Sequence, residues 1–258
     1  MNFVAALMLL DKIMADIKSF VRQDMIVQFS GDSGDSAQRT ATLYAMTSVL
    51  ETPKLERRFN WIGLNYERSI NALTVAPGVY RRSTDASHWG YNPNNFSRDQ
   101  FSILQLAFAM NGDRFRLKQA MDGLISRKLL HQNVHPGTDA PPEFRKFPDV
   151  AHPSHFSVHI RGMGYWFLYP VLVAIDCFLL ADLAVRAVHD PANDLDNMLS
   201  QHILYAALRY PTPASWLARH LYALTNWKEK LRAYHGPARN GIPPLAELII
   251  LAYNIFES

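Results

Sequence analysis

Two carboxylates stand at the predicted starts of helices, where a charged group can be held for catalysis. Asp35 ends the stretch GDSGD, and Asp99 lies within SRDQ; Arg39 follows Asp35 by four residues, and Arg98 adjoins Asp99. A carboxylate in the first turn of a helix is stabilised by the helix dipole. Paired carboxylates in different surroundings are what acid and base catalysis on a glycosidic bond requires. We therefore expect Asp35 and Asp99 to be the catalytic pair, the alternative being helix caps with a surface ion pair.

A long polar stretch rich in aromatic residues lies between two apolar helical segments. Residues 79–100 read VYRRSTDASHWGYNPNNFSRDQ. Loops of this length inside a domain are uncommon and are functional or disordered, and the aromatic content argues against disorder. Trp89 and Tyr91, with Tyr80 and Trp61, offer flat surfaces on which sugar rings can stack. The residues expected to contact substrate are Arg39, Arg82, His88, Trp89, Tyr91, Arg98, Gln100 and His155.

Histidines are concentrated in a proline-containing segment at residues 131–159. His155 and His159 are spaced so that they would share one face of a helix, and zinc accepts three such ligands with an open fourth position. However, HExxH is absent, and the prolines oppose a regular helix. A polar loop whose histidines bond to structure or substrate is the preferred interpretation, with no metal and no cofactor expected. The full set is His131, His135, His152, His155 and His159.

The bulk composition predicts a single globular domain spanning residues 1–258. Apolar residues make up 48% of the chain, which is enough for a sizeable core. The net charge of +3 is small and the basic residues are scattered, so no nucleic-acid partner is expected. The single cysteine, Cys177, lies in an apolar run, where a thiol is usually inert packing. A reducing, cytoplasmic location fits this cysteine usage.

Two apolar segments raise the question of a membrane. Residues 165–185 are long enough to span a bilayer, but Asp176 and Asp182 lie inside them and would be costly in lipid. The apolar stretch at residues 3–10 has no cationic region before it, and helical spacing continues past it, unlike a signal peptide. We therefore expect a buried inner helix at 165–185, an amphipathic helix at the N-terminus, and no membrane span.

Helical periodicity dominates the chain, and strand-like alternation of useful length is absent. The fold class expected is all-α, with about eight or nine helices. Polar loops that lead into acidic helix starts suggest helical hairpins placed side by side, with their loops gathered at one end. The start at Ser97 and the stop at Asn111 and Gly112 mark one helix at both ends. The expected helices are residues 2–23, 35–50, 54–73 in part, 98–110, 113–128, 164–189, 194–209, 213–234 and 243–256.

Two segments carry a resemblance to known proteins. Residues 31–45, GDSGDSAQRTATLYA, and residues 80–100 resemble segments of uncharacterised bacterial and phage proteins with G-D-[ST]-x-x-R and S-R-D-Q helix starts. That pattern is loosely similar to (α/α) toroids, the scaffold of several glycoside hydrolases and polysaccharide lyases. The resemblance implies a toroid of helical hairpins acting on a carbohydrate ligand. Because this chain supplies few helices for a complete toroid, a partial or open version is expected.

The function predicted from these features is processing of a glycan, by hydrolysis or elimination, at paired carboxylates in a cleft at the helix N-termini. Two alternatives stay open. One is a non-catalytic helical binding protein, such as a phage-encoded one, that uses the same pocket for a ligand. The other is a metal-dependent hydrolase that uses the histidines of residues 131–159.

Overall fold

The computed structural model describes residues 3–27, 36–48, 55–84, 96, 98–126, 227–236 and 241–257. This part of the chain is mostly helical, in agreement with the all-α prediction, and it also holds two small antiparallel hairpins. The helices are α1 (Phe3–Lys18), α2 (Ser36–Thr47), α3 (Leu55–Ile62), α4 (Tyr66–Leu73), α5 (Arg98–Met110), α6 (Arg114–Ser126), α11 (Trp227–Tyr234) and α12 (Pro243–Glu257). The strands are β1 (Val21–Arg22), β2 (Met25–Ile26), β3 (Thr74–Ala76) and β4 (Val79–Tyr80).

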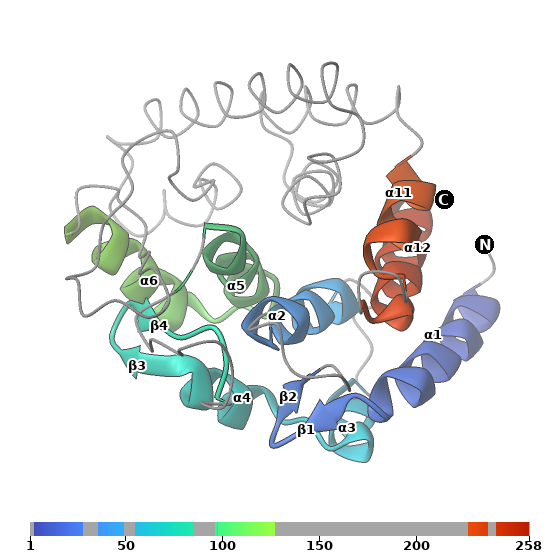
Figure 1. Cartoon of the computed structure of the whole chain (residues 1–258), viewed down its shortest axis with the longest axis horizontal. Helices are drawn as coiled ribbons and strands as arrows, with labels where there is room; N and C mark the ends of the chain where they lie inside the picture. Colours follow the sequence, from blue (N-terminus) through green and yellow to red (C-terminus); the bar gives the residue numbers. More distant parts are fainter. Residues whose placement is uncertain are drawn as a thin grey trace.

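The described helices form two rows (Figure 1). Helices α12, α2 and α5 follow one another in the inner row, since α2 packs against α5 on one side and α12 on the other. The outer row consists of α1, α3, α4 and α6: α1 packs on α12, α4 packs on α2, and α6 packs on α5. Along the described chain from α1 to α6, outer and inner helices therefore alternate, with α3 and α4 together filling one outer position.

The sequence patterns of the two rows match their burial. In α1 the buried residues recur at helical spacing, with Leu10, Met14 and Ile17 on the covered face and Met8 69% exposed on the other. In α2 every residue is buried, although half of them are polar. The hydroxyl groups of Thr42 and Thr47 donate to backbone carbonyls four residues earlier, which satisfies them inside the core.

Helices α2 and α5 run in the same direction. At the start of α2, the backbone N–H of Ala37 donates to the carbonyl of Arg82, in the segment that leads toward α5. At the far end, the side-chain amide of Asn111, just past α5, donates to the carbonyl of Tyr44 in α2 over 3.2 Å. The first turns of both helices therefore lie at one end of the molecule.

One predicted helix was too long, because a turn interrupts it. The helix expected over residues 2–23 ends at Lys18, and the chain forms the β1–β2 hairpin, whose turn residues Gln23 and Asp24 have positive φ angles of 47° and 61°. Such a two-residue turn matches the twist of the paired strands. Residues 54–73, predicted to be helical in part, form α3 and α4, which are separated by a turn at Gly63, whose φ is +87°. Asn65 then caps α4 by accepting from the Arg68 N–H.

Other predicted ends agree with the structure. Helix α5 has the expected bounds, and Gly112 follows it with a φ of +69°, a conformation that favours glycine. Helix α12 starts at Pro243, where the missing N–H of proline costs nothing. Helix α11 lies within the expected range 213–234. The expected helices at 164–189 and 194–209 lie outside the described residues, as does the segment 131–163.

The membrane prediction is tested only in part. The candidate span at residues 165–185 lies outside the described residues. Among the helices that the structure describes, none combines the length and the apolar character needed to cross a bilayer.

Candidate functional site

The segment before α5 is attached directly to the start of α2. The N–H of Ala37 donates to the carbonyl of Arg82 over 2.8 Å, and the hydroxyl of Ser83 lies 3.4 Å from that of Ser36. The N–H groups of a first helical turn have no partner inside the helix, so an outside carbonyl satisfies one of them here. Arg82, expected to contact substrate, is half-buried beside the α2 N-terminus.

Packed aromatic rings also hold the segment before α5 in place. The Tyr80 ring lies 5.8 Å from Phe96, 6.2 Å from Phe101 and 5.8 Å from Phe108, measured between ring centroids. Tyr80 is only 1% exposed, so the expectation that it offers a surface to a sugar ring is wrong. It packs in the core because β4 turns its ring toward α5 instead of toward solvent.

Trp61, the expected stacking surface outside residues 79–100, lies on α3 in the outer row and is 53% exposed. The ammonium group of Lys18 lies 4.6 Å from the centre of its ring. This cation–π contact joins the end of α1 to α3 and covers one face of the indole. The exposed Trp61 therefore belongs to the outer surface, where α1 and α3 meet.

A buried arginine and a buried histidine meet near the start of α2. Arg39 is 6% exposed and His235, just past α11, is 2% exposed. Burial, together with the smaller effect of the positive charge of Arg39, lowers the pKa of His235 to about 3. His235 is therefore neutral at physiological pH. The prediction of a surface ion pair for Arg39 is wrong, because α2 is covered on every side.

Helix α12 also begins at this end. Gly241, two residues before α12, lies directly against the backbone of His235, so that any side chain at this position would overlap it. Helix α12 packs against α2, and the charge of Arg39 acts on His235, so we place the start of α12 near Arg39. We call the beginnings of α2, α5 and α12, together with Arg39 and His235, the N-terminal cluster.

Buried amide side chains add to this polar environment. Gln38 and Gln100 are 1% and 0% exposed. The Nε2 atom of Gln38 has no acceptor in the part of the chain that the structure describes. Burying an unsatisfied amide is costly, which is typical of sites kept for a purpose other than stability. Gln100, expected to contact substrate, lies inside the protein at the start of α5.

The structure covers the predicted site residues unequally. Arg98 and Asp99 form the first turn of α5, as predicted, although their side chains lie outside the description. Arg39, Arg82 and Gln100 are described with their side chains and lie near the starts of α2 and α5. The remaining expected site residues lie outside the described ranges; they are Asp35, His88, Trp89, Tyr91 and His155.

Sequence reasoning missed His235 as part of this end of the molecule. It lies at the end of a short helix and has no spacing to Arg39 that a pattern would reveal, since the two residues are far apart in the chain. Its only local signal is the helix stop formed by His235 and Gly236. Among the described residues, no group of three or more His, Cys, Asp or Glu side chains is arranged to hold a metal ion.

Comparisons with known proteins add no family or relative. No protein-family model, no curated protein and no solved structure matches this chain.

Proposed function

We propose that this chain is a glycan-processing enzyme whose cleft lies at the N-terminal cluster, with Asp35 and Asp99 as its two carboxylates. The observation that carries the proposal is the common direction of α2 and α5, which brings their first turns to one end of the molecule. Asp35 directly precedes α2, and Asp99 lies in the first turn of α5. The positive ends of the two helix dipoles would then stabilise both carboxylates.

A partial or open (α/α) toroid is the architecture we propose for the whole chain. Two features of the described helices support it. From α1 to α6, outer and inner helices alternate along the chain, as helical hairpins placed side by side require. In addition, the last helix, α12, packs against both α1 and α2, so the two ends of the chain meet within the two rows (Figure 1).

The buried charge of Arg39 supports a role for Asp35. A cation in the interior needs a carboxylate or several acceptors close by, and Asp35 precedes Arg39 by four residues. An adjacent guanidinium favours the ionised form of a carboxylate. We therefore assign Asp35 as the base and Asp99 as the acid. For hydrolysis, Asp99 protonates the departing glycosidic oxygen as the bond to the sugar carbon breaks, while Asp35 removes a proton from the attacking water.

The test compares two conservative variants with a matched control. Asp35→Asn and Asp99→Asn are assayed for release of reducing ends, and for the ultraviolet absorbance of an unsaturated elimination product, on a panel of neutral and acidic polysaccharides. We expect each variant to lose at least about 100-fold in turnover, as removal of a general acid or base does. The control is Asp122→Asn, an exposed carboxylate on α6 that pairs with Lys118.

The melting temperatures decide between catalysis and capping. Loss of turnover with melting temperatures within about 2 °C of the parent supports the proposal. If both variants unfold the protein, the two carboxylates are structural caps. If the parent chain turns over none of the polysaccharides but retains one of them in affinity electrophoresis, it is the non-catalytic binding protein instead.

A further inference from the structure

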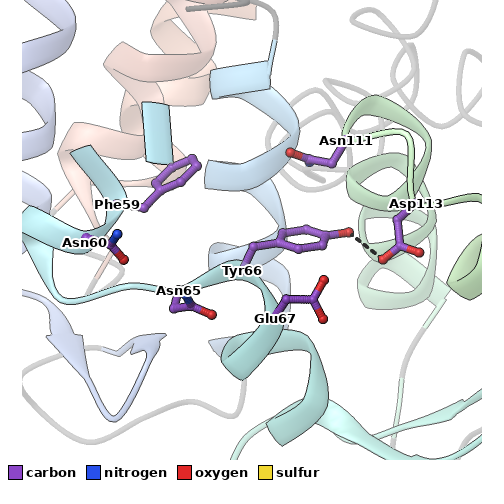
Figure 2. A pocket seen from close by; sticks show the side chains of 7 residues that line it. All are labelled: Phe59, Asn60, Asn65, Tyr66, Glu67, Asn111 and Asp113. Carbon is purple, nitrogen blue, oxygen red and sulfur yellow. Dashed lines mark hydrogen bonds between the residues drawn. The ribbon is translucent and has the colours of Figure 1, made fainter. Parts of the chain in front are cut away.

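A hollow lies at the ends of α2 and α5 opposite to the N-terminal cluster. It has a volume of about 450 Å³. Its walls come from α3, from the start of α4, and from the turn between α5 and α6. Figure 2 shows Phe59 and Asn60 on one side, Asn111 and Asp113 on the other, and Tyr66 between them. We call this hollow the α3–α5 pocket. Its volume falls within the range of about 300–1,000 Å³ that is common for small-molecule sites.

The amide side chains of the pocket are held in place and still have hydrogen-bonding capacity. The Nδ2 atom of Asn111 donates to the carbonyls of Tyr44 and Ala107, which fixes the side chain and leaves Oδ1 as an acceptor. The Oδ1 atom of Asn65 accepts from the Arg68 N–H, which leaves its Nδ2 as a donor. Neither of these remaining atoms has a hydrogen-bond partner within the described ranges. The pocket thus presents an acceptor on one wall and a donor on another.

The charged groups of the pocket are largely paired with one arginine. Arg116 binds Glu67 through Nη2 at 2.6 Å and Asp113 through Nη1 at 2.7 Å. The hydroxyl of Tyr66 donates to Asp113 over 3.2 Å (Figure 2), and burial, followed by the charge of Asp113, raises the Tyr66 pKa, so the phenol stays neutral. Two carboxylates against one guanidinium leave a net charge of about −1, which disfavours an anionic ligand.

Aromatic rings supply the apolar part of the wall. Phe59 and Tyr66 both line the pocket, and the ring of Tyr44 packs edge-on against each of them, with centroids 5.0 Å and 5.1 Å apart. This support keeps the two rings from collapsing into the hollow. A ligand that enters therefore meets a preformed apolar surface together with planar polar groups.

We propose that the α3–α5 pocket binds an uncharged polyhydroxylated ring, of the monosaccharide class. A hydroxyl group both donates and accepts, so a ring bearing several of them satisfies Asn111 Oδ1 and Asn65 Nδ2 together. The less polar face of such a ring packs on Tyr66 and Phe59. An ammonium ligand would satisfy the carboxylates and the Asn111 oxygen but would leave the amide donors of Asn60 and Asn65 without acceptors.

This proposal does not depend on the proposed glycan-processing activity, because the pocket and the N-terminal cluster lie at opposite ends of α2 and α5. The test uses the full chain and titrates it with glucose, galactose, mannose and N-acetylglucosamine, and separately with choline and acetate. Binding is followed by saturation-transfer NMR and by calorimetry. We expect at least one of the sugars to bind, and neither choline nor acetate to compete with it.

Two variants locate the binding. Asn65→Asp keeps the helix cap, since aspartate caps as well as asparagine, but replaces the Nδ2 donor with an acceptor. Asn60→Trp fills the pocket from an exposed position on α3. We expect Asn65→Asp to weaken the sugar affinity at least about ten-fold, because a hydrogen-bond donor is lost. We expect Asn60→Trp to weaken it at least about as much, because the indole occupies the space of the ligand. Neither variant should change the melting temperature much. Asp122→Asn, at an exposed carboxylate on α6 that pairs with Lys118, serves as the control and leaves sugar binding unchanged, while Asp99→Asn reports any sugar bound at the proposed cleft.

Three outcomes would overturn the proposal. The first is that none of the four sugars binds the parent chain. The second is that choline binds and the sugars do not, which would make the pocket a cation site. The third is that sugar binding persists in both pocket variants but is lost in Asp99→Asn, which would place it at the proposed cleft.

Discussion

The two ends of α2 and α5 carry similar polar residues in opposite environments. At the N-terminal cluster, Arg39 and His235 are enclosed, with exposures of 6% and 2%. At the α3–α5 pocket, Arg116 and Asp113 keep 17% and 13% of their side chains exposed and bind each other at 2.7 Å. The enclosed histidine has its pKa lowered to about 3, whereas burial raises the pKa of Tyr66 in the pocket and carboxylates hold Arg116 charged.

The difference shows how enclosure decides what a polar group can do. A group shut away from water titrates far from its usual range, since no solvent stabilises its charged form. A group at an open pocket keeps its charge, because water and a bonded counter-ion both support it. In our two proposals, the first end carries out the chemistry and the second recognises a ligand by fixed hydrogen bonds.

The largest expected effect comes from the aromatic cluster that supports the enclosed end. Tyr80→Ala removes a ring that contacts Phe96, Phe101 and Phe108 and leaves a cavity. We expect the free energy of unfolding to fall by about 3–5 kcal/mol. Urea unfolding followed by circular dichroism measures it. A loss below about 1 kcal/mol would mean that this cluster does not hold the segment before α5.

The next largest expected effect is a pH dependence of the free energy of unfolding, caused by His235 at the enclosed end. The folded-state pKa of His235 is about 3, below its unfolded value of 6.5. Between these values the unfolded chain binds a proton that the folded chain does not. The contribution to stability is therefore complete above pH 6.5 and falls by about 1.4 kcal/mol per pH unit as the pH decreases toward 3.

His235→Gln isolates this contribution, because other groups also titrate at low pH. Unfolding free energies of the variant and the parent chain are measured between pH 4 and 7.5. Over this range we expect the stability of the parent relative to that of the variant to decrease as the pH falls. A difference that stays constant over this range would show that His235 is not kept neutral by its surroundings.

A smaller loss is expected at the open pocket. Arg116→Met breaks the contacts of the guanidinium with Glu67, Asp113 and Asn71 and leaves the Asp113 carboxylate without its cation. We expect a loss of about 1–2 kcal/mol, because Asp113 is mostly covered while Glu67 is exposed. The measurement is urea unfolding at low and high salt. An unchanged free energy of unfolding would mean that the contacts of Arg116 do not stabilise the fold.

The smallest effect is expected from an exposed ion pair on α6. Lys118 and Asp122 lie 2.6 Å apart, and each side chain is half exposed. Lys118→Met should change the free energy of unfolding by about 0.5 kcal/mol or less, since water screens such pairs. The same titration measures it beside Arg116→Met. An equal loss in both variants would remove the distinction between the pocket network and an ordinary surface pair.

Local signals predicted individual helices well. The bounds of α5 follow from the polar start at Ser97 and the stop at Gly112, and α12 begins at the proline that marks it. The end of α1 was missed because Phe20 and Val21 continue its apolar spacing. A long-range contact helps to hold the hairpin there instead: the N–H of Ile26 donates to the hydroxyl of Thr40 in α2.

The candidate site could be predicted only at the level of helix starts. The motifs around Asp35 and Asp99 mark two helix beginnings, but they do not show that Arg39 is enclosed or that His235 lies beside it. Of the pocket residues, Asn111 was predicted only as a helix stop, and no role was predicted for Asn65 or Asp113. Each of them satisfies a local backbone group, which is the part of its role that a sequence window contains.

By itself, the sequence determined where helices begin and end and which residues carry charge, because caps, stops and apolar spacing act over a few neighbouring residues. Only the tertiary structure decided that α2 is covered on all sides, which polar groups lose contact with water, and which helix ends meet. Burial and pKa depend on neighbours from distant parts of the chain, such as Arg39 and His235, and no local pattern encodes that proximity.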